Sequence, residues 1–566
     1  MDNPQVSRAL ERTADLMELG GENPFKVRAF RSAARAVADL TEDLHVLSER
    51  GELRSIPGVG ETIGARVREL LETGECAALK ELEAEIPIGL CDLLALPGIG
   101  LKKVQALWRG AGVAGLSDLE ALARDGRLRL VTGFTERSEG AVIEAIAAYR
   151  RRSSRLPIEA ASRAAVEWAA RVAAVAASQP ELSGQLRRRQ DLVDTIRLLL
   201  PTDAPEALRL SLLMLDWISE GPEGGLALSG FGLPDAELIL CRTHEAGAAR
   251  LLATGSRDYV DWLKSHAGGA LPGGESEAVV FSALGLPELP PELREGAARA
   301  SWDQSLALPL IELGDYLGSM HNHSTWSDGL VSVDEMAEAA LSRGHSYIAI
   351  TDHSKSLGVA RGLDEARLAS QGLEIQALRT RLPGSFRVFR GIECDILADG
   401  EMDLAEEALR DLDLVVGSVH LHQRMDRDTM TRRVLAALRT GLIDILAHPT
   451  GRILGARDPF PIDLEAVAEC AAELDIALEI NAAPARLDLS AEAARMAAAR
   501  GCKISINPDA HRPGELGRVE WGISQARRAG LTAADVINTW DADRVSDWLA
   551  SRRRGECGES RKRAGA

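Results

Sequence analysis

The 566-residue sequence predicts a multidomain protein with a helical N-terminal region and a C-terminal α/β barrel. The length is far beyond what one hydrophobic core supports. Two Pro-Gly-x-Gly turns, at 57–60 and 97–100, each precede a helix-forming segment. In the C-terminal half, short apolar runs typical of buried strands recur, and each is followed by a histidine or a carboxylate.

The composition is that of an ordinary globular protein, with a formal net charge of −19. Because a net negative charge repels nucleic acid, contact with DNA would require a confined surface of the opposite charge. No apolar run is long enough for a membrane span, and the N-terminus is polar from the start, so we expect no transmembrane helix, no signal peptide and a cytoplasmic location. The seven cysteines are scattered and lack CxxC spacing, which argues against disulfides and a thiolate zinc site.

Residues 1–85 predict a helical domain, because the segment NPFKVRAFRSAARAVADL carries apolar residues at helical spacing. The glycine turns before the helical segments would leave backbone N–H groups open to a phosphate. Such hairpins hold the DNA backbone without reading bases. The predicted DNA-contacting residues are Gly58, Gly60, Gly98, Gly100, Lys102 and Lys103. Plain turns are the alternative, and Gly133 marks a third, degenerate copy at 131–146.

The stretch 321–511 holds eight of the eleven histidines. Groups at the C-terminal ends of successive parallel strands meet on one face of an α/β barrel. The residues that follow the apolar runs are His321, His323, Asp328, His353, Glu393, His420, His448, Asp509 and His511. Imidazole and carboxylate ligands without thiolate suit Zn²⁺, Mn²⁺ or Fe²⁺. The pattern therefore predicts a polynuclear metal site, with Asp352 as a supporting or structural neighbour.

The phrases HNHSTWSDG, ITDHS, GIECDI, GSVHLH, LAHPTGRILGARDPFPID, ALEINAAPARLDL and SINPDAHRP resemble the polymerase-and-histidinol-phosphatase (PHP) domain. The match is closest to the version fused to bacterial family X DNA polymerases. The resemblance implies a distorted (β/α)7 barrel over 317–550 that binds two or three divalent ions, Mn²⁺ or Zn²⁺. It implies one ion at His321, His323, Glu393 and Asp509, a second at Asp328, His353 and His511, and a third at Glu393, His420 and His448. It also implies that Asp328, His353, Glu393 and Asp509 are catalytic.

The same resemblance implies a fingers-like segment with the second hairpin at 86–150, and an α+β nucleotidyltransferase-like palm and thumb at 151–316. Two-metal nucleotidyl transfer needs two carboxylates at i and i+2 of a strand. Here those two positions are Thr195 and Arg197, and the third carboxylate position is Glu237. We therefore expect that polymerase catalysis is lost.

Together these features predict a metal-dependent DNA 3′–5′ exonuclease or 3′-end-processing phosphoesterase of DNA repair. Arg452 and Arg457 are the predicted contacts of the substrate phosphate, with surface ion pairs as the alternative. Three other interpretations stay open: a phosphatase of small phosphate esters with a vestigial DNA-binding half, a DNA-binding scaffold with structural metals, and an active family X polymerase. We expect a monomer that ends in a disordered basic tail at 551–566.

Overall fold

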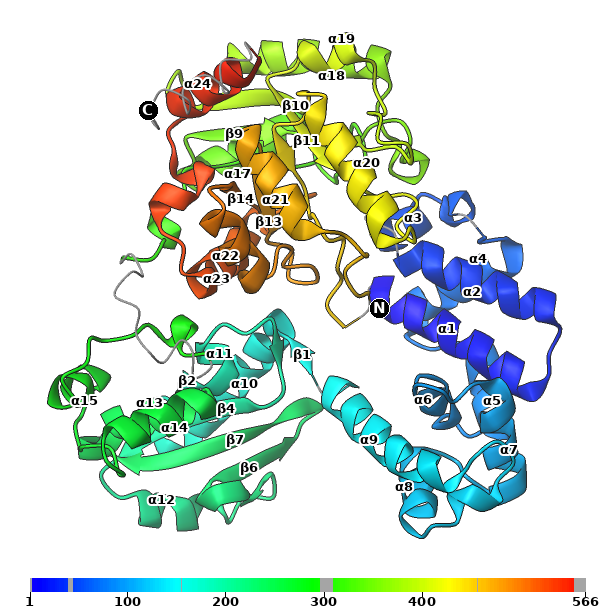
Figure 1. The fold of residues 1–566 in the computed structure, drawn as a ribbon, viewed down its shortest axis with the longest axis vertical. Helices are drawn as coiled ribbons and strands as arrows, with labels where there is room; N and C mark the ends of the chain where they lie inside the picture. The colour runs from blue at the N-terminus through cyan, green and yellow to red at the C-terminus, as the bar shows by residue number, and fades with distance from the viewer. Residues whose placement is uncertain are drawn as a thin grey trace. The chain divides into compact units, whose positions relative to one another are not determined.

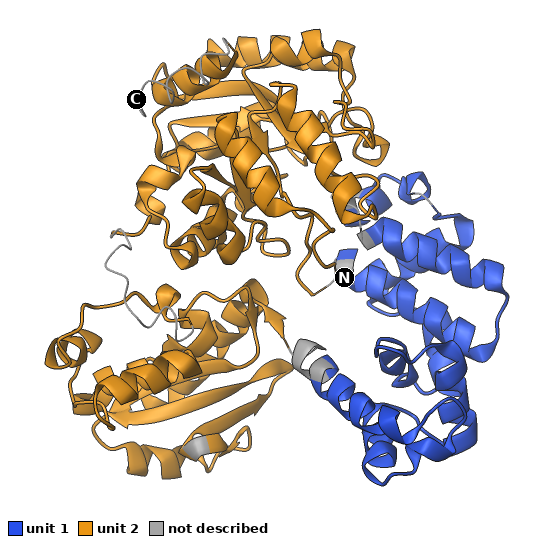
Figure 2. Ribbon diagram, viewed as in Figure 1, with its two compact units in different colours: residues 1–154 blue, residues 155–566 orange. Residues whose placement is uncertain are grey.

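The computed structural model describes residues 3–38, 44–56, 58–153, 155–295, 309–455 and 457–553. The chain forms two compact units, residues 1–154 and 155–566 (Figure 2). Pro57 of the first predicted hairpin and most of the predicted tail, 554–566, lie outside the described residues. No helix in the described ranges is both long enough and apolar enough for a membrane span.

Unit 1 is helical throughout its described residues (Figure 1). Its α-helices are α1 (Asn3–Gly20), α2 (Pro24–Ala38), α3 (Leu44–Glu49), α4 (Glu61–Thr73), α5 (Ala77–Glu85), α6 (Leu90–Leu94), α7 (Leu101–Ala111), α8 (Leu116–Arg124) and α9 (Glu136–Ser153). They enclose two small hydrophobic cores, one built from residues 6–76 and one from residues 86–146 together with two leucines of α1. Helix α1 joins the two cores, because Leu10 packs in the first while Leu16 and Leu19 pack in the second.

Three turns of unit 1 repeat one backbone pattern. Gly58, Gly98 and Gly133 have φ angles of 82°, 75° and 94°, a region that glycine adopts without strain. The residue after each glycine donates its N–H to the carbonyl three residues earlier, at 3.0 to 3.1 Å. Helices α4, α7 and α9 begin two residues further on. The expected third copy at 131–146 therefore has the same turn as the two glycine-rich copies.

The first domain of unit 2 is an α+β domain, as expected. Its five-stranded sheet has the order β2-β4-β7-β6-β5, with bounds Glu181–Ser183, Ile196–Thr202, Leu233–Arg242, Leu226–Gly230 and Ile218–Glu220. The two central strands, β4 and β7, run parallel. Helix α10 (Ile158–Ala176) contributes to their core through the buried Trp168. Further helices are α11 (Gly184–Arg187), α12 (Pro205–Leu212), α13 (Ala246–Thr254), α14 (Arg257–His266) and α15 (Glu277–Ala283).

The second domain of unit 2 is a nearly closed barrel of seven parallel strands that follow one another in chain order, which confirms the expected (β/α)7 architecture. The strands are β8 (Gly318–Ser319), β9 (Tyr347–Ile350), β10 (Arg387–Asp395), β11 (Leu414–Ser418), β12 (Ile445–Leu446), β13 (Ala477–Asn481) and β14 (Lys503–Asn507). Helices α17 (Val333–Ser342), α18 (Glu365–Arg379), α20 (Arg427–Arg439), α21 (Leu464–Glu473), α22 (Ala491–Ala499) and α23 (Val519–Ala529) accompany them (Figure 1). A parallel bridge between Asn322 and Ala510 joins the first and last segments of the ring.

One end of the barrel is closed by the C-terminal helix α24 (Ala542–Arg553). Its Val545 and Trp548 share a core with Tyr347 and Leu414, which lie at the starts of β9 and β11. The predicted start of the disordered tail, residue 551, differs from the structure. Residues 551–553 still belong to helix α24, and the buried side chain of Arg552 bonds to Asp444 at 3.0 Å. The site must therefore form at the opposite end, where the strands finish.

Candidate metal centre

All nine predicted ligands meet at the C-terminal ends of the barrel strands. His321 and His323 follow β8, His353 follows β9, Glu393 belongs to β10, His420 follows β11, His448 follows β12, and Asp509 and His511 follow β14. The sequence placed Glu393 after a strand, whereas β10 continues to Asp395. All nine are buried or nearly so, with side-chain exposures between 0% and 14%.

Glu393 lies at the middle of this group. One carboxylate oxygen, Oε2, is 3.3 Å from His321 Nε2 and 2.8 Å from His353 Nδ1. The other, Oε1, is 3.3 Å from His420 Nε2 and 3.0 Å from His448 Nε2. His323 Nε2 lies 3.7 Å from Oε2 as well. A single carboxylate thus faces five imidazoles, which is the arrangement of a bridging ligand.

Asp328 and Asp509 organise the remaining histidines. Asp328 Oδ2 is 3.4 Å from both His353 Nε2 and His511 Nε2. Asp509 Oδ1 is 3.0 Å from His323 Nε2. Ligand atoms that could share one ion form three groups: His323, Asp328, His353 and His511; His321, His323 and Glu393; His353, Glu393 and His420. These groups resemble the three implied sites in part: His323 also joins Asp328, His353 and His511, and His353 also joins Glu393 and His420. Asp509 and His448, two of the implied ligands, belong to none of the three groups.

Several nitrogen and oxygen atoms of these residues are buried, and although some lie close to one another, none of them makes a hydrogen bond with good geometry among the described residues. They are His321 Nε2, His323 Nδ1, both ring nitrogens of His353, Glu393 Oε2 and His511 Nε2. An unsatisfied buried polar atom costs about 1–3 kcal/mol, so a cluster of them calls for a ligand. The donor set of imidazole and carboxylate fits divalent transition metals. The residues present are therefore compatible with bound metal ions.

The charges of the site also favour a cation. Burial raises the pKa values of Asp328, Glu393 and Asp509, but the surrounding histidines outweigh it and hold all three well below the ordinary range. Burial lowers the pKa of His353, but Asp328 and Glu393 raise it well above the ordinary value. The carboxylates thus stay ionised and require positive charge beside them.

Glu479, a buried residue of β13, is the main supporting group that the sequence did not reveal. Its Oε1 lies 2.8 Å from His321 Nδ1, and its Oε2 accepts the backbone N–H of His448 at 2.8 Å. A carboxylate that bonds the outer nitrogen of a ligand histidine fixes the ring and its tautomer. The sequence feature that could have indicated it is a glutamate within the strand segment ALEIN, which is buried at every position.

Other carboxylates and amides hold the site from outside. Asn481 Nδ2 donates to Asp509 Oδ2 at 2.9 Å, and Asp395 Oδ1 lies 3.3 Å from His420 Nδ1. Asp352 does not face the ligands; its carboxylate accepts hydrogen bonds from Ser324 and Ser327, at the start of the loop that carries Asp328. The structure therefore supports the structural interpretation of Asp352.

Two predicted ligands have an unusual backbone. His448 has a φ angle of 27° and Asp509 one of 52°, in the region that costs about 1–3 kcal/mol for residues other than glycine. Such strain persists only where surrounding contacts fix the chain. At His448 the backbone bond to Glu479 supplies such a contact.

The predicted phosphate contacts differ in their surroundings. Arg452 Nε donates to the carbonyl of Arg486 at 3.1 Å, and its Nη2 pairs with Asp191 at 2.7 Å. This argues against Arg452 as a phosphate contact, because its guanidinium is already used. Arg457 donates to Gly451 O at 2.9 Å, and its role stays a prediction.

The sequence missed Arg486, which lies in the turn after β13. Its side chain is half-buried and has no hydrogen-bond or ion-pair partner among the described residues. Its positive charge is close enough to add to the lowering of the His448 pKa, which burial causes in the main. Arg486 is therefore a cation beside the site with its guanidinium available.

In the α+β domain, Glu237, the predicted third carboxylate position, takes part in an ion pair with Arg197. Arg197 of β4 and Glu237 of β7 are direct partners in the parallel ladder, and Arg197 Nε donates to Glu237 Oε2 at 2.8 Å. Thr195 precedes β4. Asp194 is paired with Arg155 at 2.8 Å. The charges around Glu237 are thus already balanced without a metal.

The predicted DNA-contacting residues of unit 1 lie at helix N-termini. Gly60 and Gly100 are the residues before α4 and α7, and a side chain at either position would meet open space. Lys102 is exposed, whereas Lys103 donates to the carbonyl of Gly98 at 2.9 Å and lies over the Phe134 ring. Lys103 thus ties the second turn to the third.

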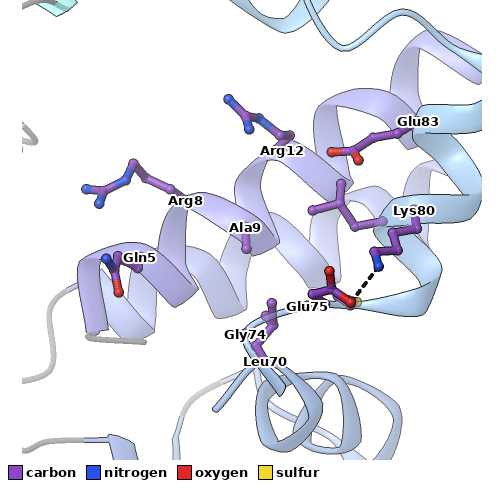
Figure 3. A pocket seen from close by; sticks show the side chains of 11 residues that line it. Gln5, Arg8, Ala9, Arg12, Leu70, Gly74, Glu75, Lys80 and Glu83 are labelled. Atoms are coloured by element: carbon purple, nitrogen blue, oxygen red, sulfur yellow. Dashed lines mark hydrogen bonds and ion pairs between the residues drawn. The ribbon is translucent and has the colours of Figure 1, made fainter. Parts of the chain in front are cut away.

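Unit 1 also has a pocket between α1 and α5 (Figure 3). Arg8 and Arg12, one helical turn apart on α1, line it, and neither has an ion-pair partner among the described residues. Lys80 at the other side pairs with Glu75 at 2.5 Å. None of the predicted metal ligands lines this pocket, so the pocket is separate from the candidate metal centre.

Three known domain families match parts of this chain. Residues 1–76 match the helix-hairpin-helix domain, residues 91–148 match the SAM-like helix-hairpin-helix tandem, and residues 319–483 match the PHP domain. The tandem includes the degenerate third turn at Gly133. These matches confirm the resemblance inferred from the sequence motifs.

Individual proteins match over the whole chain or over the barrel. The "DNA polymerase/3′-5′ exonuclease PolX" of Bacillus subtilis (strain 168) is 34% identical and covers 97% of this chain and 99% of its own length. A probable phosphatase of Thermoanaerobacter sp. (strain X514) is 28% identical over 42% of this chain and 96% of its own length. A probable phosphatase of Tolumonas auensis is 31% identical over 39% of this chain and 89% of its own length.

Glu479→Gln should weaken metal binding by about 10- to 100-fold, because the neutral amide no longer polarises and orients His321. Bound Mn²⁺ measured by equilibrium dialysis of the full-length protein checks this. Glu473→Gln, an exposed glutamate at the end of α21, is the matched control and should bind metal normally. Equal affinity in both variants would show that Glu479 has no part in the site.

Proposed function

Because this chain belongs to the bacterial PolX family, we propose that it is a metal-dependent DNA 3′–5′ exonuclease or 3′-end-processing phosphoesterase of DNA repair. The helix-hairpin-helix motifs of unit 1 would hold the DNA backbone without sequence preference, and the barrel would hydrolyse the phosphodiester. The observation that carries the proposal is the group of nine histidines and carboxylates with Glu393 at its middle, together with the unpartnered ring nitrogens of His321, His323, His353 and His511.

The residues that would hold the ions are the nine named above. When bound, divalent ions lower the pKa of a coordinated water and withdraw charge from a phosphoryl oxygen. The protein's own part is to fix the ligands: Glu479 orients His321, Asn481 orients Asp509, and Asp395 lies beside the outer nitrogen of His420. Arg486 is suited to bind the substrate phosphate, since its guanidinium is available next to His448.

We also propose that nucleotidyl transfer is lost. A bound Mg²⁺ would need carboxylates where Thr195 and Arg197 stand, and the guanidinium of Arg197 would repel it. The ion pair of Arg197 with Glu237 supports this interpretation, because it occupies the remaining carboxylate.

A second candidate function is hydrolysis of a small phosphate ester. It is favoured by the similarity of the barrel to the two probable phosphatases, which correspond to little more than this part of the chain. The exonuclease proposal is preferred, because three repeated hairpins and tandem helix-hairpin-helix matches have no use in a phosphatase of small molecules.

His353→Ala and Asp509→Asn should each lower hydrolysis of end-labelled DNA in the presence of Mn²⁺ by about 100-fold or more, because each change removes a group that would hold an ion in place. Release of labelled nucleotide per unit time is the measurement. His345→Ala, a histidine outside the cluster, is the control. Parental rates in both site variants would place the active site elsewhere.

Primed and gapped DNA should not be extended when nucleotides are supplied, because Thr195 and Arg197 cannot hold the metal pair. The assay uses the His353→Ala variant, so that degradation does not mask synthesis. Template-directed extension by that variant would mean that the α+β domain is an active polymerase.

Replacing Gly60 and Gly100 together by leucine should weaken DNA binding, because the side chains would stand in the open space where a phosphate approaches the helix N-termini. These positions are better probes than Gly58 and Gly98, whose positive φ angles make any replacement strained. Gly110→Leu, an exposed position in α7 with open space around it, is the control.

The expected pattern for the double variant is a loss of activity on long DNA with normal turnover of a small activated phosphodiester. The opposite pattern, unchanged DNA cleavage with far faster turnover of a small phosphate monoester, would favour the phosphatase. Binding measured at rising salt should fall steeply for the parent, because the contacts go to phosphates.

A further inference from the structure

Asp191, at the edge of the α+β domain, is nearly buried against the barrel. Its Oδ2 pairs with Arg452 at 2.7 Å, and its Oδ1 accepts from Gln525 at 2.8 Å and from Arg528. Burial raises the pKa of Asp191, but Arg528 and Arg452 outweigh it, so the pKa lies below the ordinary value. One carboxylate of the α+β domain thus holds two arginines of the barrel domain.

The apolar contacts around this ion-pair cluster join the same two domains. Leu487 of the barrel domain belongs to the hydrophobic core of the α+β domain and is 1% exposed. Leu454 and Trp521 pack against that core as well. A second ion pair, between Arg527 of α23 and Glu292 at 2.7 Å, also joins the two domains. The α+β domain is therefore fixed to the barrel at this surface.

Arg452 links this surface to the loops that carry the predicted ligands. It follows His448 by four residues, and it donates to the carbonyls of Arg486 and Leu487 in the turn after β13. The next residue, Asp488, accepts the N–H and the hydroxyl of Thr450 at 3.0 and 2.8 Å. The two loops are thus tied to each other directly behind His448.

The connection continues to Asp509. Backbone bonds pair Asp488 with Asn481, and the Asn481 side chain donates to Asp509 Oδ2 at 2.9 Å. Both predicted ligands at the end of this route, His448 and Asp509, have positive φ angles that need support.

We propose that Asp191 is a positioning residue for the metal centre, which acts through Arg452 on the loops that hold His448 and Asp509. The α+β domain would then serve the hydrolytic site as a scaffold, although its own nucleotidyl-transfer carboxylates are missing. This inference rests on the proposed hydrolytic function of the barrel.

The test compares Asp191→Asn with Asp194→Asn in the full-length, metal-stripped protein. Asn keeps the size of the side chain but removes the negative charge that pairs with Arg452 and Arg528. Asp194 is 40% exposed and pairs with Arg155 of its own domain. We expect the Kd for Mn²⁺ to rise about 10-fold in Asp191→Asn and to stay unchanged in Asp194→Asn.

Turnover of a small activated phosphodiester provides a second readout. In Asp191→Asn it should fall at low Mn²⁺ and recover at saturating Mn²⁺, with KM for the phosphodiester unchanged. A merely structural role would lower the unfolding temperature without moving the Mn²⁺ affinity, and that result would overturn the inference.

Arg452→Lys keeps the charge opposite Asp191 but loses the planar fork that reaches the two carbonyls. It should also weaken Mn²⁺ binding, and normal affinity in this variant would break the proposed link even if Asp191→Asn failed to fold. A parent that binds no Mn²⁺ would instead overturn the proposed function itself, and the inference with it.

Discussion

The burial of Glu393 among five imidazoles is the interaction on which the barrel domain depends. A carboxylate with 1% exposure keeps its charge only where positive charge or metal compensates it. The strands that surround it supply this compensation from four different positions in the chain. The fold of the barrel and the buried charges at its open end therefore depend on each other, because neither the carboxylate nor the histidines would be stable there alone.

The α+β domain shows the opposite solution to the same problem. Where a nucleotidyltransferase would leave carboxylates together for metal ions, this chain pairs Glu237 with Arg197 on the neighbouring strand. Charge is balanced inside the protein, and no external cation is required. The two domains thus differ in what surrounds the carboxylate: Glu237 has an arginine partner, whereas Glu393 is surrounded by histidines, which are also metal-binding groups.

Much of the fold and of the candidate site could be predicted from the sequence. The nine strand-end residues could be recognised because their side-chain types recur after apolar runs, and the first two hairpins because two glycines mark each turn. Glu479 and Asn481 were missed, since a polar residue inside a buried strand carries no sign of what it contacts. The Asp191 pairs could not be predicted, because they join positions 261 and 337 residues apart and have no local pattern.

The closure of the barrel has a consequence for the order in which the protein matures on the ribosome. His321 bonds to Glu479, 158 residues later, and His323 contacts Asp509, 186 residues later, while α24 completes the closed end. Contacts so distant along the chain form slowly and only after their last partner has emerged. Unit 1 consists of short helices joined by local turns and can fold during synthesis. A nascent chain would acquire its hairpins long before the histidine and carboxylate cluster of the barrel, so a prematurely terminated product would retain the hairpins without the cluster.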